Sequence, residues 1–280
     1  MNKNFYSTFI LTVTLLFSAF AANAAPAKRI VSLTPAITEI ICQLGAADRL
    51  VGRSSACNYP EEIKKVTVAG DMANPFPEKI FSLAPDTIIC DSEHPDANFQ
   101  LFRSHGINIC KLPGARLADY PANVRTIGKL LGLEKSAEIE IMRFEKNLAR
   151  LRSTVASRRS APPKVLLVLG LNPVITCGTN TFTSELIEAA GGENIAAGKS
   201  GYFAVSAEFV AAAAPEIILA ADMPGIDRQL ASIPGWQHLP AVKSQRIHSD
   251  LKADLLFRLG PRITTGLEIL QQIFALKNTK

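Results

Sequence analysis

Residues 134–158 read EKSAEIEIMRFEKNLARLRSTVASR, and this stretch decides the fold. Its apolar residues recur every three or four positions, which is the period of one face of an α-helix: Ile141, Phe144, Leu148, Leu151 and Val155. Gly132 favours the end of an earlier helix, and Pro162-Pro163 stops this one. A helix of about 25 residues extends for about 37 Å, so the stretch predicts one stiff connecting helix.

Both flanks of this helix alternate short apolar runs with helical stretches. Continuous apolar runs are typical of parallel strands covered on both faces, and strand–helix–strand repetition implies crossover helices. The sequence therefore predicts an α/β fold of two lobes, each a parallel sheet with flanking helices. The expected parts are an N-terminal lobe at 25–133, the connecting helix at 134–161 and a C-terminal lobe at 162–280. The expected strands are 29–34, 50–54, 87–90, 107–112, 164–171, 216–221 and 246–249.

The first 24 residues have the layout of a secretory signal peptide. Lys3 precedes an apolar run at 9–20, and Ala22-Asn23-Ala24 fits a peptidase cleavage site. The run is shorter than the roughly 20 residues of a spanning helix, although a membrane anchor is the alternative. We expect cleavage near Ala24 and a soluble, exported protein.

Composition narrows the possible functions. Hydrophobic residues make up 48% and charged residues 20% of the 280 residues, which excludes a disordered chain, a coiled coil and collagen. A net charge of +5 without a long basic block gives only weak support for nucleic-acid binding, so no nucleic-acid partner is expected. An exported chain can form disulfides, but five cysteines are an odd number and a chain of this size does not need them. We expect buried or free thiols.

A fragment recurs in the two halves. Residues 82–89 (SLAPDTII) match residues 212–219 (AAAPEIIL), and in each copy a glutamate, Glu78 or Glu208, precedes the proline by seven positions. A second match pairs 38–41 (TEII) with 184–187 (SELI). These matches favour a helix, a turn and a strand built once in each lobe, against the alternative of chance similarity among α/β turns.

Common catalytic motifs are absent from the sequence. It holds no Gly-x-Ser-x-Gly and no His-Glu-x-x-His, and Gly198-Lys199-Ser200 lacks the earlier glycine of a phosphate loop. Cys57, Cys90, Asp91 and His94 are expected near carboxyl ends of strands, where α/β proteins bind ligands. They are candidates for lining a cleft or, alternatively, for holding a soft metal, although their spacing fits no zinc pattern.

Residues 254–262 (DLLFRLGPR) hold a second candidate pair. Asp254 and Arg258 are expected in a loop before a terminal helix at 263–276. An arginine there can hydrogen-bond a carboxylate, phosphate or amide oxygen while the aspartate holds it in place. The alternative is a surface ion pair of little energetic consequence.

Together with several further stretches, these residues resemble the periplasmic substrate-binding proteins of ABC importers. The similarity is greatest to the cobalamin-binding branch of the class that binds cobalamin, haem and iron–siderophore complexes. It covers about residues 28–276 and rests on these stretches: 29–39 (RIVSLTPAITE), 57–60 (CNYP), 83–86 (LAPD), 172–173 (NP), 190–194 (AGGEN) and 254–262.

The resemblance implies two lobes bridged by one helix, a small closing motion and a ligand cleft between the lobes. It also implies a function, namely capture of a corrinoid, cobalamin, and its delivery to an inner-membrane ABC permease and its ATPase. The protein is then no enzyme and holds no cofactor or metal of its own; we expect a monomer. One surface glutamate on each lobe, Glu78 and Glu208, is implied to dock onto arginines of the permease.

The resemblance also implies ligand-binding residues. Asp254 and Arg258 match the residues that hydrogen-bond the corrin amides in the cobalamin binder. The aromatic positions depart from that pattern, because this chain has Ala56, Met72 and Asp91 there, and only Tyr202 keeps an aromatic ring.

Haem or a ferric siderophore is the alternative ligand within the same class. Haem iron usually takes a tyrosine or histidine ligand, and Tyr59, His94 and Tyr202 are the candidates. An enzyme or metal carrier built on the cysteine group is a third alternative. The single tryptophan, Trp236, is expected to pack in the core of the C-terminal lobe.

Overall fold

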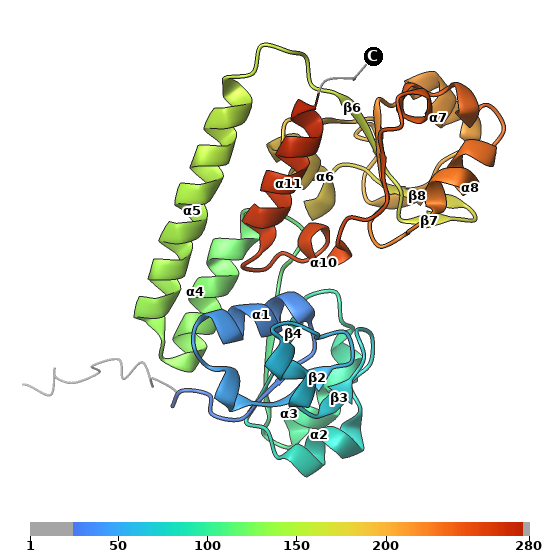
Figure 1. Cartoon of the computed structure of the whole chain (residues 1–280). Coiled ribbons are helices and arrows are strands. Elements are labelled where there is room, and N and C mark those ends of the chain that lie inside the picture. The colour runs from blue at the N-terminus through green and yellow to red at the C-terminus, as the bar shows by residue number, and fades with distance from the viewer. Residues whose placement is uncertain (1–24, 277–280) are drawn as a thin grey trace, which may run out of the picture.

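The computed structural model describes residues 25–276, so the predicted signal peptide lies outside the described residues. The long helix α5 (Glu134–Ala156) joins a lower and an upper lobe (Figure 1). It buries Ile141, Phe144, Leu148 and Leu151, so the apolar stripe faces the protein as predicted. The helix ends at Ala156, before residue 158, where the periodic stretch ends, and before the predicted boundary at 161; its connecting role is confirmed.

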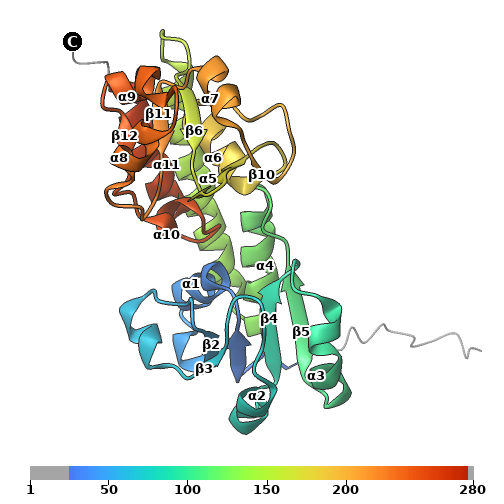
Figure 2. The same cartoon turned by 90° about the vertical axis from the view of Figure 1, so that its right-hand side faces the viewer.

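A second helix accompanies α5 along part of its length. Helix α4 (Asp119–Leu131) packs beside α5 in both views, and Gly132 ends it in the left-handed conformation (φ 65°) (Figures 1 and 2). The ring centroids of Tyr120 and Phe144 lie 4.7 Å apart, and the Tyr120 hydroxyl donates to Glu140 Oε1 at 2.7 Å. The connection between the lobes is therefore a braced pair of helices rather than one isolated rod.

The N-terminal lobe is built on one five-stranded parallel sheet of order β3-β2-β1-β4-β5. Short helices cover this sheet, and the strand β3 was not predicted. The strands are β1 (Ile30–Ser32), β2 (Leu50–Ser54), β3 (Val68–Gly70), β4 (Thr87–Asp91) and β5 (Asn108–Leu112). The helices are α1 (Pro35–Gln43), α2 (Pro77–Leu83) and α3 (Gln100–Ser104), with 3₁₀ turns η1 (Ala47–Arg49), η2 (Glu61–Lys65) and η3 (Asp96–Phe99).

The C-terminal lobe holds two sheets. A four-stranded parallel sheet has the order β12-β11-β6-β9, and a three-stranded antiparallel sheet has the order β10-β8-β7. The strands are β6 (Lys164–Leu167), β7 (Gly170–Leu171), β8 (Val174–Cys177), β9 (Glu193–Asn194), β10 (Tyr202–Ala204), β11 (Ile217–Leu219) and β12 (Ile247–His248). The helices are α6 (Phe182–Ala189), α7 (Ala207–Ala213), α8 (Ile226–Ser232), α9 (Pro240–Lys243), α10 (Ala253–Leu256) and α11 (Ile263–Ala275), with the turn η4 (Trp236–His238).

The prediction of one strand at 164–171 is wrong. The backbone N–H of Val168 still donates to Leu219 in the parallel sheet, whereas that of Leu169 donates to Ile175 in the antiparallel one. The chain thus changes sheets between two adjacent residues, and β7 pairs back onto β8 through the turn at 172–173. Residues 165–171 include no polar residue, so their composition does not mark this change.

One apolar cluster extends through both lobes. It includes Leu148 and Leu151 of α5 together with Leu267 and Leu270 of α11, all buried. Two smaller clusters lie within single lobes, and one of them contains the fully buried Trp236, as predicted. Because the shared cluster packs the lobes against the connecting helices, it resists changes in their spacing.

All five cysteines are unpaired thiols, which agrees with the prediction. Within residues 25–276, no helix is long and apolar enough to span a bilayer.

Candidate functional site

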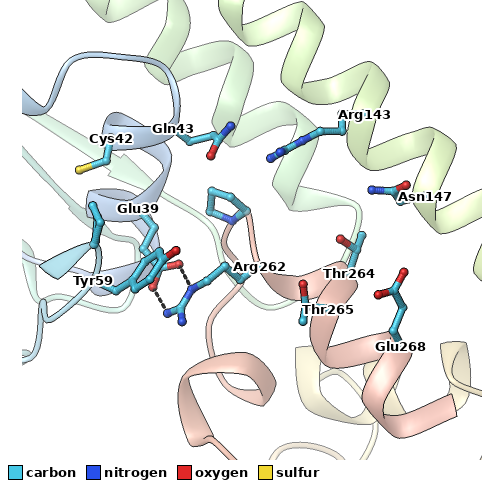
Figure 3. A pocket seen from close by; sticks show the side chains of 12 residues that line it. Glu39, Cys42, Gln43, Tyr59, Arg143, Asn147, Arg262, Thr264, Thr265 and Glu268 are labelled. Atoms are coloured by element: carbon cyan, nitrogen blue, oxygen red, sulfur yellow. Dashed lines mark hydrogen bonds and ion pairs between the residues drawn. The ribbon is translucent and has the colours of Figure 1, made fainter. Parts of the chain in front are cut away.

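A buried carboxylate joins the two lobes. Glu39 lies on α1, and its side chain is only 2% exposed. Arg262, which directly precedes α11, donates to both of its oxygens, with Nε–Oε2 at 2.8 Å and Nη2–Oε1 at 2.6 Å (Figure 3). Arg258 donates from Nη1 to the same Oε1 at 3.0 Å. Two arginines of the C-terminal lobe therefore share one glutamate of the N-terminal lobe.

Asp254 completes this group from the C-terminal lobe. Its Oδ1 lies 2.6 Å from Arg258 Nη2, and its Oδ2 lies 3.7 Å from Arg262 Nη2. Asp254 was predicted in a loop, but it lies in the short helix α10. Because residues four apart lie on the same side of a helical turn, the side chains of Asp254 and Arg258 meet. We call Glu39, Asp254, Arg258 and Arg262 the junction cluster.

Close packing fixes the segment that carries these side chains. Gly266 on α11 has no Cβ, and a Cβ there would overlap the backbone carbonyl of Leu255 on α10. Helix α10 therefore rests directly on α11, which positions Asp254 against the arginines.

Further contacts tie the arginines to the loop after β2. Arg258 Nη1 donates to Asn58 Oδ1 at 2.7 Å, and its Nη2 donates to the Ala56 carbonyl at 3.3 Å. The Tyr59 ring lies against the Arg262 guanidinium, with 3.8 Å from Cζ to the ring centroid. Hydrogen bonds to Glu39 raise the pKa of Arg262, so this arginine stays charged.

No role was predicted for Glu39 or Arg262, although both lie in stretches that carry the family resemblance. A signal was present, because Glu39 is the only acid in the apolar helix PAITEIICQ. An acid flanked by apolar residues in such a helix is either at the surface or held by a partner, and the partner is more than 200 residues away.

The remaining predicted ligand residues lie on facing parts of the lobes. Ala56, Met72 and Asp91 lie at or just after the carboxyl ends of β2, β3 and β4, which share one edge of the parallel sheet. Tyr202 begins β10, which lies on the lower side of the upper lobe in Figure 2. Its side chain is exposed. Asp91 Oδ2 accepts from the Thr34 hydroxyl at 3.0 Å.

A cavity of about 430 Å³ lies on the α5 side of the junction cluster. In Figure 3, Arg143 and Asn147 of α5 point toward the side chains of α1 and α11. None of the six predicted ligand residues lines it. Its lining is Glu39, Cys42, Gln43, Tyr59, Pro60, Arg143, Asn147, Pro261, Arg262, Thr264, Thr265 and Glu268.

A second glutamate, in the C-terminal lobe, accepts hydrogen bonds from the N-terminal lobe. Glu185 on α6 accepts from Arg116 Nε at 3.0 Å and from the Leu117 backbone N–H at 2.7 Å. Glu39 and Glu185 are the matched positions of the second sequence repeat, TEII and SELI. Each copy of the second repeat therefore supplies one glutamate that accepts hydrogen bonds from the other lobe.

Of the cysteine group predicted near the strand ends, Asp91 and His94 are in contact, and among residues 25–276 the two cysteines are not part of a metal site. Cys57 and Cys90 are buried in different apolar clusters, and burial raises the pKa of the Cys90 thiol to about 12. His94 is nearly buried, with Nδ1 at 2.9 Å from Asp91 Oδ1. In the described part of the chain, no group of three or more His, Cys, Asp or Glu side chains is arranged to hold a metal ion.

The glutamates of the first repeat occupy equivalent places. Glu78 and Glu208 are each the second residue of a seven-residue helix, α2 or α7, and both are exposed. Each helix ends in a left-handed alanine, Ala84 (φ 43°) or Ala214 (φ 49°), before the proline. The repeated unit is confirmed, and Figure 2 shows α2 at the bottom of the lower lobe and α7 near the top of the upper lobe. Hydrogen bonds from its own backbone N–H and from Ser206 lower the pKa of Glu208.

Comparisons with known proteins agree along nearly the whole chain. The family described as periplasmic binding protein matches residues 30–252. The chain is 30% identical over 253 residues to an uncharacterized ABC transporter substrate-binding lipoprotein, YvrC, of Bacillus subtilis (strain 168), covering 88% of this chain and 79% of that protein. It is 28% identical over 272 residues to the vitamin B12-binding protein of Pectobacterium carotovorum subsp. carotovorum (strain PC1), covering 96% of both.

Solved structures of two ligand classes share the fold. The periplasmic haem-binding protein RhuT of Roseiflexus sp. RS-1, in its apo form, matches with a TM-score of 0.81 and 31% identity, over 89% of this chain and 98% of that one. The vitamin B12-binding protein BtuF of Vibrio cholerae matches with a TM-score of 0.78 and 27% identity, over 89% and 97%.

Proposed function

The chain belongs to the periplasmic binding protein family, in the class of ABC-type binding proteins for B12, haem and siderophores, and we propose that its ligand is a corrinoid, cobalamin. Proteins of this family bind substrates for transport and are not enzymes. They work with a membrane permease and an ATPase. In this proposal the protein is a periplasmic monomer that captures cobalamin and delivers it unchanged to the importer.

The observation that carries the proposal is the group of polar side chains at the junction cluster, above all Arg258 and Asp254. Arg258 contacts Glu39, Asn58 and the Ala56 carbonyl, so it lies where the lobes meet. Its Nε–H has no acceptor among residues 25–276, and the Asp254 side chain is 29% exposed. A carboxamide both donates and accepts hydrogen bonds, so the side chains at the rim of a corrin ring suit this donor and acceptor.

Apolar side chains on the facing lobes support the same ligand. Met72 of the lower lobe and Tyr202 of the upper lobe are 58% and 60% exposed. A flat macrocycle gains binding energy when its faces cover apolar and aromatic side chains. In the proposal, the two residues contact the macrocycle from opposite sides, and Ala56 and Asp91 contact it from the strand ends.

Calorimetric titration with cyanocobalamin tests the ligand. We expect one corrinoid to bind per chain. We expect Arg258→Ala to weaken binding by about 1–3 kcal/mol, because it removes a charged hydrogen-bond donor. Arg228→Ala on α8 is the matched control, since Arg228 is exposed and belongs to no part of the proposed site.

Different outcomes overturn different parts of the proposal. Unchanged affinity in Arg258→Ala would remove Arg258 from the site. No heat with cyanocobalamin, together with tight binding of haem, would overturn the ligand and leave the class of binding protein intact.

Haem is the second candidate, favoured by one observation besides the haem-binding relatives. Tyr202 is 60% exposed and begins β10, which lies on the lower side of the upper lobe in Figure 2, and phenolate oxygen is an established ligand of haem iron. His94 is less suited, because its ring is nearly buried. A Soret band in the absorption spectrum of the protein titrated with haem, lost in Tyr202→Phe, would support haem.

A further inference from the structure

The junction cluster is electrically neutral and closed on itself. It holds two carboxylates, Glu39 and Asp254, and two guanidinium groups, Arg258 and Arg262. Arg262 makes two hydrogen bonds to Glu39, and Arg258 makes one to Glu39 and an ion pair with Asp254. Each positive charge therefore already faces a negative charge inside the cluster.

Neighbouring groups occupy part of what remains, although the Nε–H of Arg258 keeps no acceptor among residues 25–276. Asn58 and the Ala56 carbonyl accept from Arg258, and the Tyr59 ring covers Arg262. The side chains of Arg258 and Arg262 are only 13% and 22% exposed. An anionic group that reaches this place meets no uncompensated cation within the cluster. It must give up water and approach two carboxylates, which is unfavourable in a partly buried site.

We infer that the junction cluster selects ligands by the charge of their rim, accepting uncharged carboxamides and rejecting carboxylates. The inference rests on the proposed function, because it requires the ligand to lie against Arg258. Asp254 is then a specificity-determining residue. It keeps Arg258 from offering its charge to the carboxylate of an acidic ligand.

The test compares ligands that differ only in this charge. The probes are cyanocobalamin and each of its isomeric monocarboxylic acids, in which a single rim amide is hydrolysed. We expect at least one isomer to bind the unaltered protein about tenfold or more weakly than cyanocobalamin, as for an unpaired ionised group near a buried site. Haem and haem dimethyl ester form a second matched pair.

Two variants assign the effect to the cluster. Asp254→Asn preserves the shape of the side chain and removes one negative charge, so Arg258 gains an unpaired charge. We expect the ratio of the affinity for cyanocobalamin to the affinity for the acid to fall about tenfold in this variant. Asp227→Asn on α8 is an exposed change of the same kind, and it should leave the preference unchanged.

The outcomes separate this inference from the proposed function. Equal binding of every acid and its amide by the unaltered protein would overturn the inference alone, as would an unchanged preference in Asp254→Asn. Binding of haem dimethyl ester over haem, without corrinoid binding, would overturn cobalamin as the ligand and support the charge selection. Binding of none of these probes would overturn both.

Discussion

Replacing Glu39 with Gln is expected to lower the free energy of unfolding by about 3–5 kcal/mol, because two partly buried arginines lose their shared carboxylate. Urea denaturation measures this change. Two probes follow the unfolding. Fluorescence of the fully buried Trp236 reports on the C-terminal lobe, and far-ultraviolet circular dichroism reports on the whole chain. Because Glu39 links the two lobes, its loss should also make the unfolding curve followed by Trp236 fluorescence differ from the curve followed by circular dichroism.

Glu185→Gln is the matched comparison, because Glu185 is the equivalent residue of the second repeat. Its side chain is 29% exposed, and its partner Arg116 is 68% exposed. An exposed pair of this kind contributes about 0–1 kcal/mol, so the variant should be nearly as stable as the unaltered protein. Equal losses in the two variants would contradict the account of Glu39 as a buried tie.

Reversing both exposed glutamates of the first repeat, Glu78→Lys with Glu208→Lys, is expected to abolish ligand uptake while leaving ligand affinity unchanged. The reason is the proposed docking, in which one carboxylate on each lobe pairs with basic groups of a two-subunit permease. Each single reversal should reduce uptake less than the pair. Uptake into vesicles that contain the importer, with calorimetry on the same protein, measures both quantities.

A matched control makes the same change of charge elsewhere. Glu62→Lys with Glu188→Lys reverses one exposed glutamate on each lobe outside the repeat and should leave uptake intact. Persistent uptake in the Glu78 and Glu208 double variant would overturn the docking proposal. Loss of uptake in the control would show that overall charge matters rather than the two positions.

Local patterns in the sequence predicted much of the architecture. The three-and-four spacing at 141–155 located α5 because a helix face is a periodic, short-range property. The match of residues 82–89 with 212–219 located α2 and α7 because the same helix, turn and strand are built once in each lobe. Trp236 was placed in a core because large aromatic side chains are usually buried.

Long-range features could not be predicted in the same way. Glu39 meets Arg262 across 223 positions, and no local period indicates which arginine reaches which acid. The change of sheet between Val168 and Leu169 was missed because residues 165–171 include no polar residue that would mark it. Strand β3 was also missed, although β1 and β11 are equally short and were predicted.

A crystal structure of the protein with cyanocobalamin tests the central claim most directly, namely that two lobes at fixed spacing hold an unaltered corrinoid between them. We predict that the corrin rim lies within hydrogen-bond distance of Arg258 and Asp254, and that both lobes contact the ligand. A corrinoid seated instead in the cavity against Arg143 and Asn147, or touching one lobe only, would contradict the account.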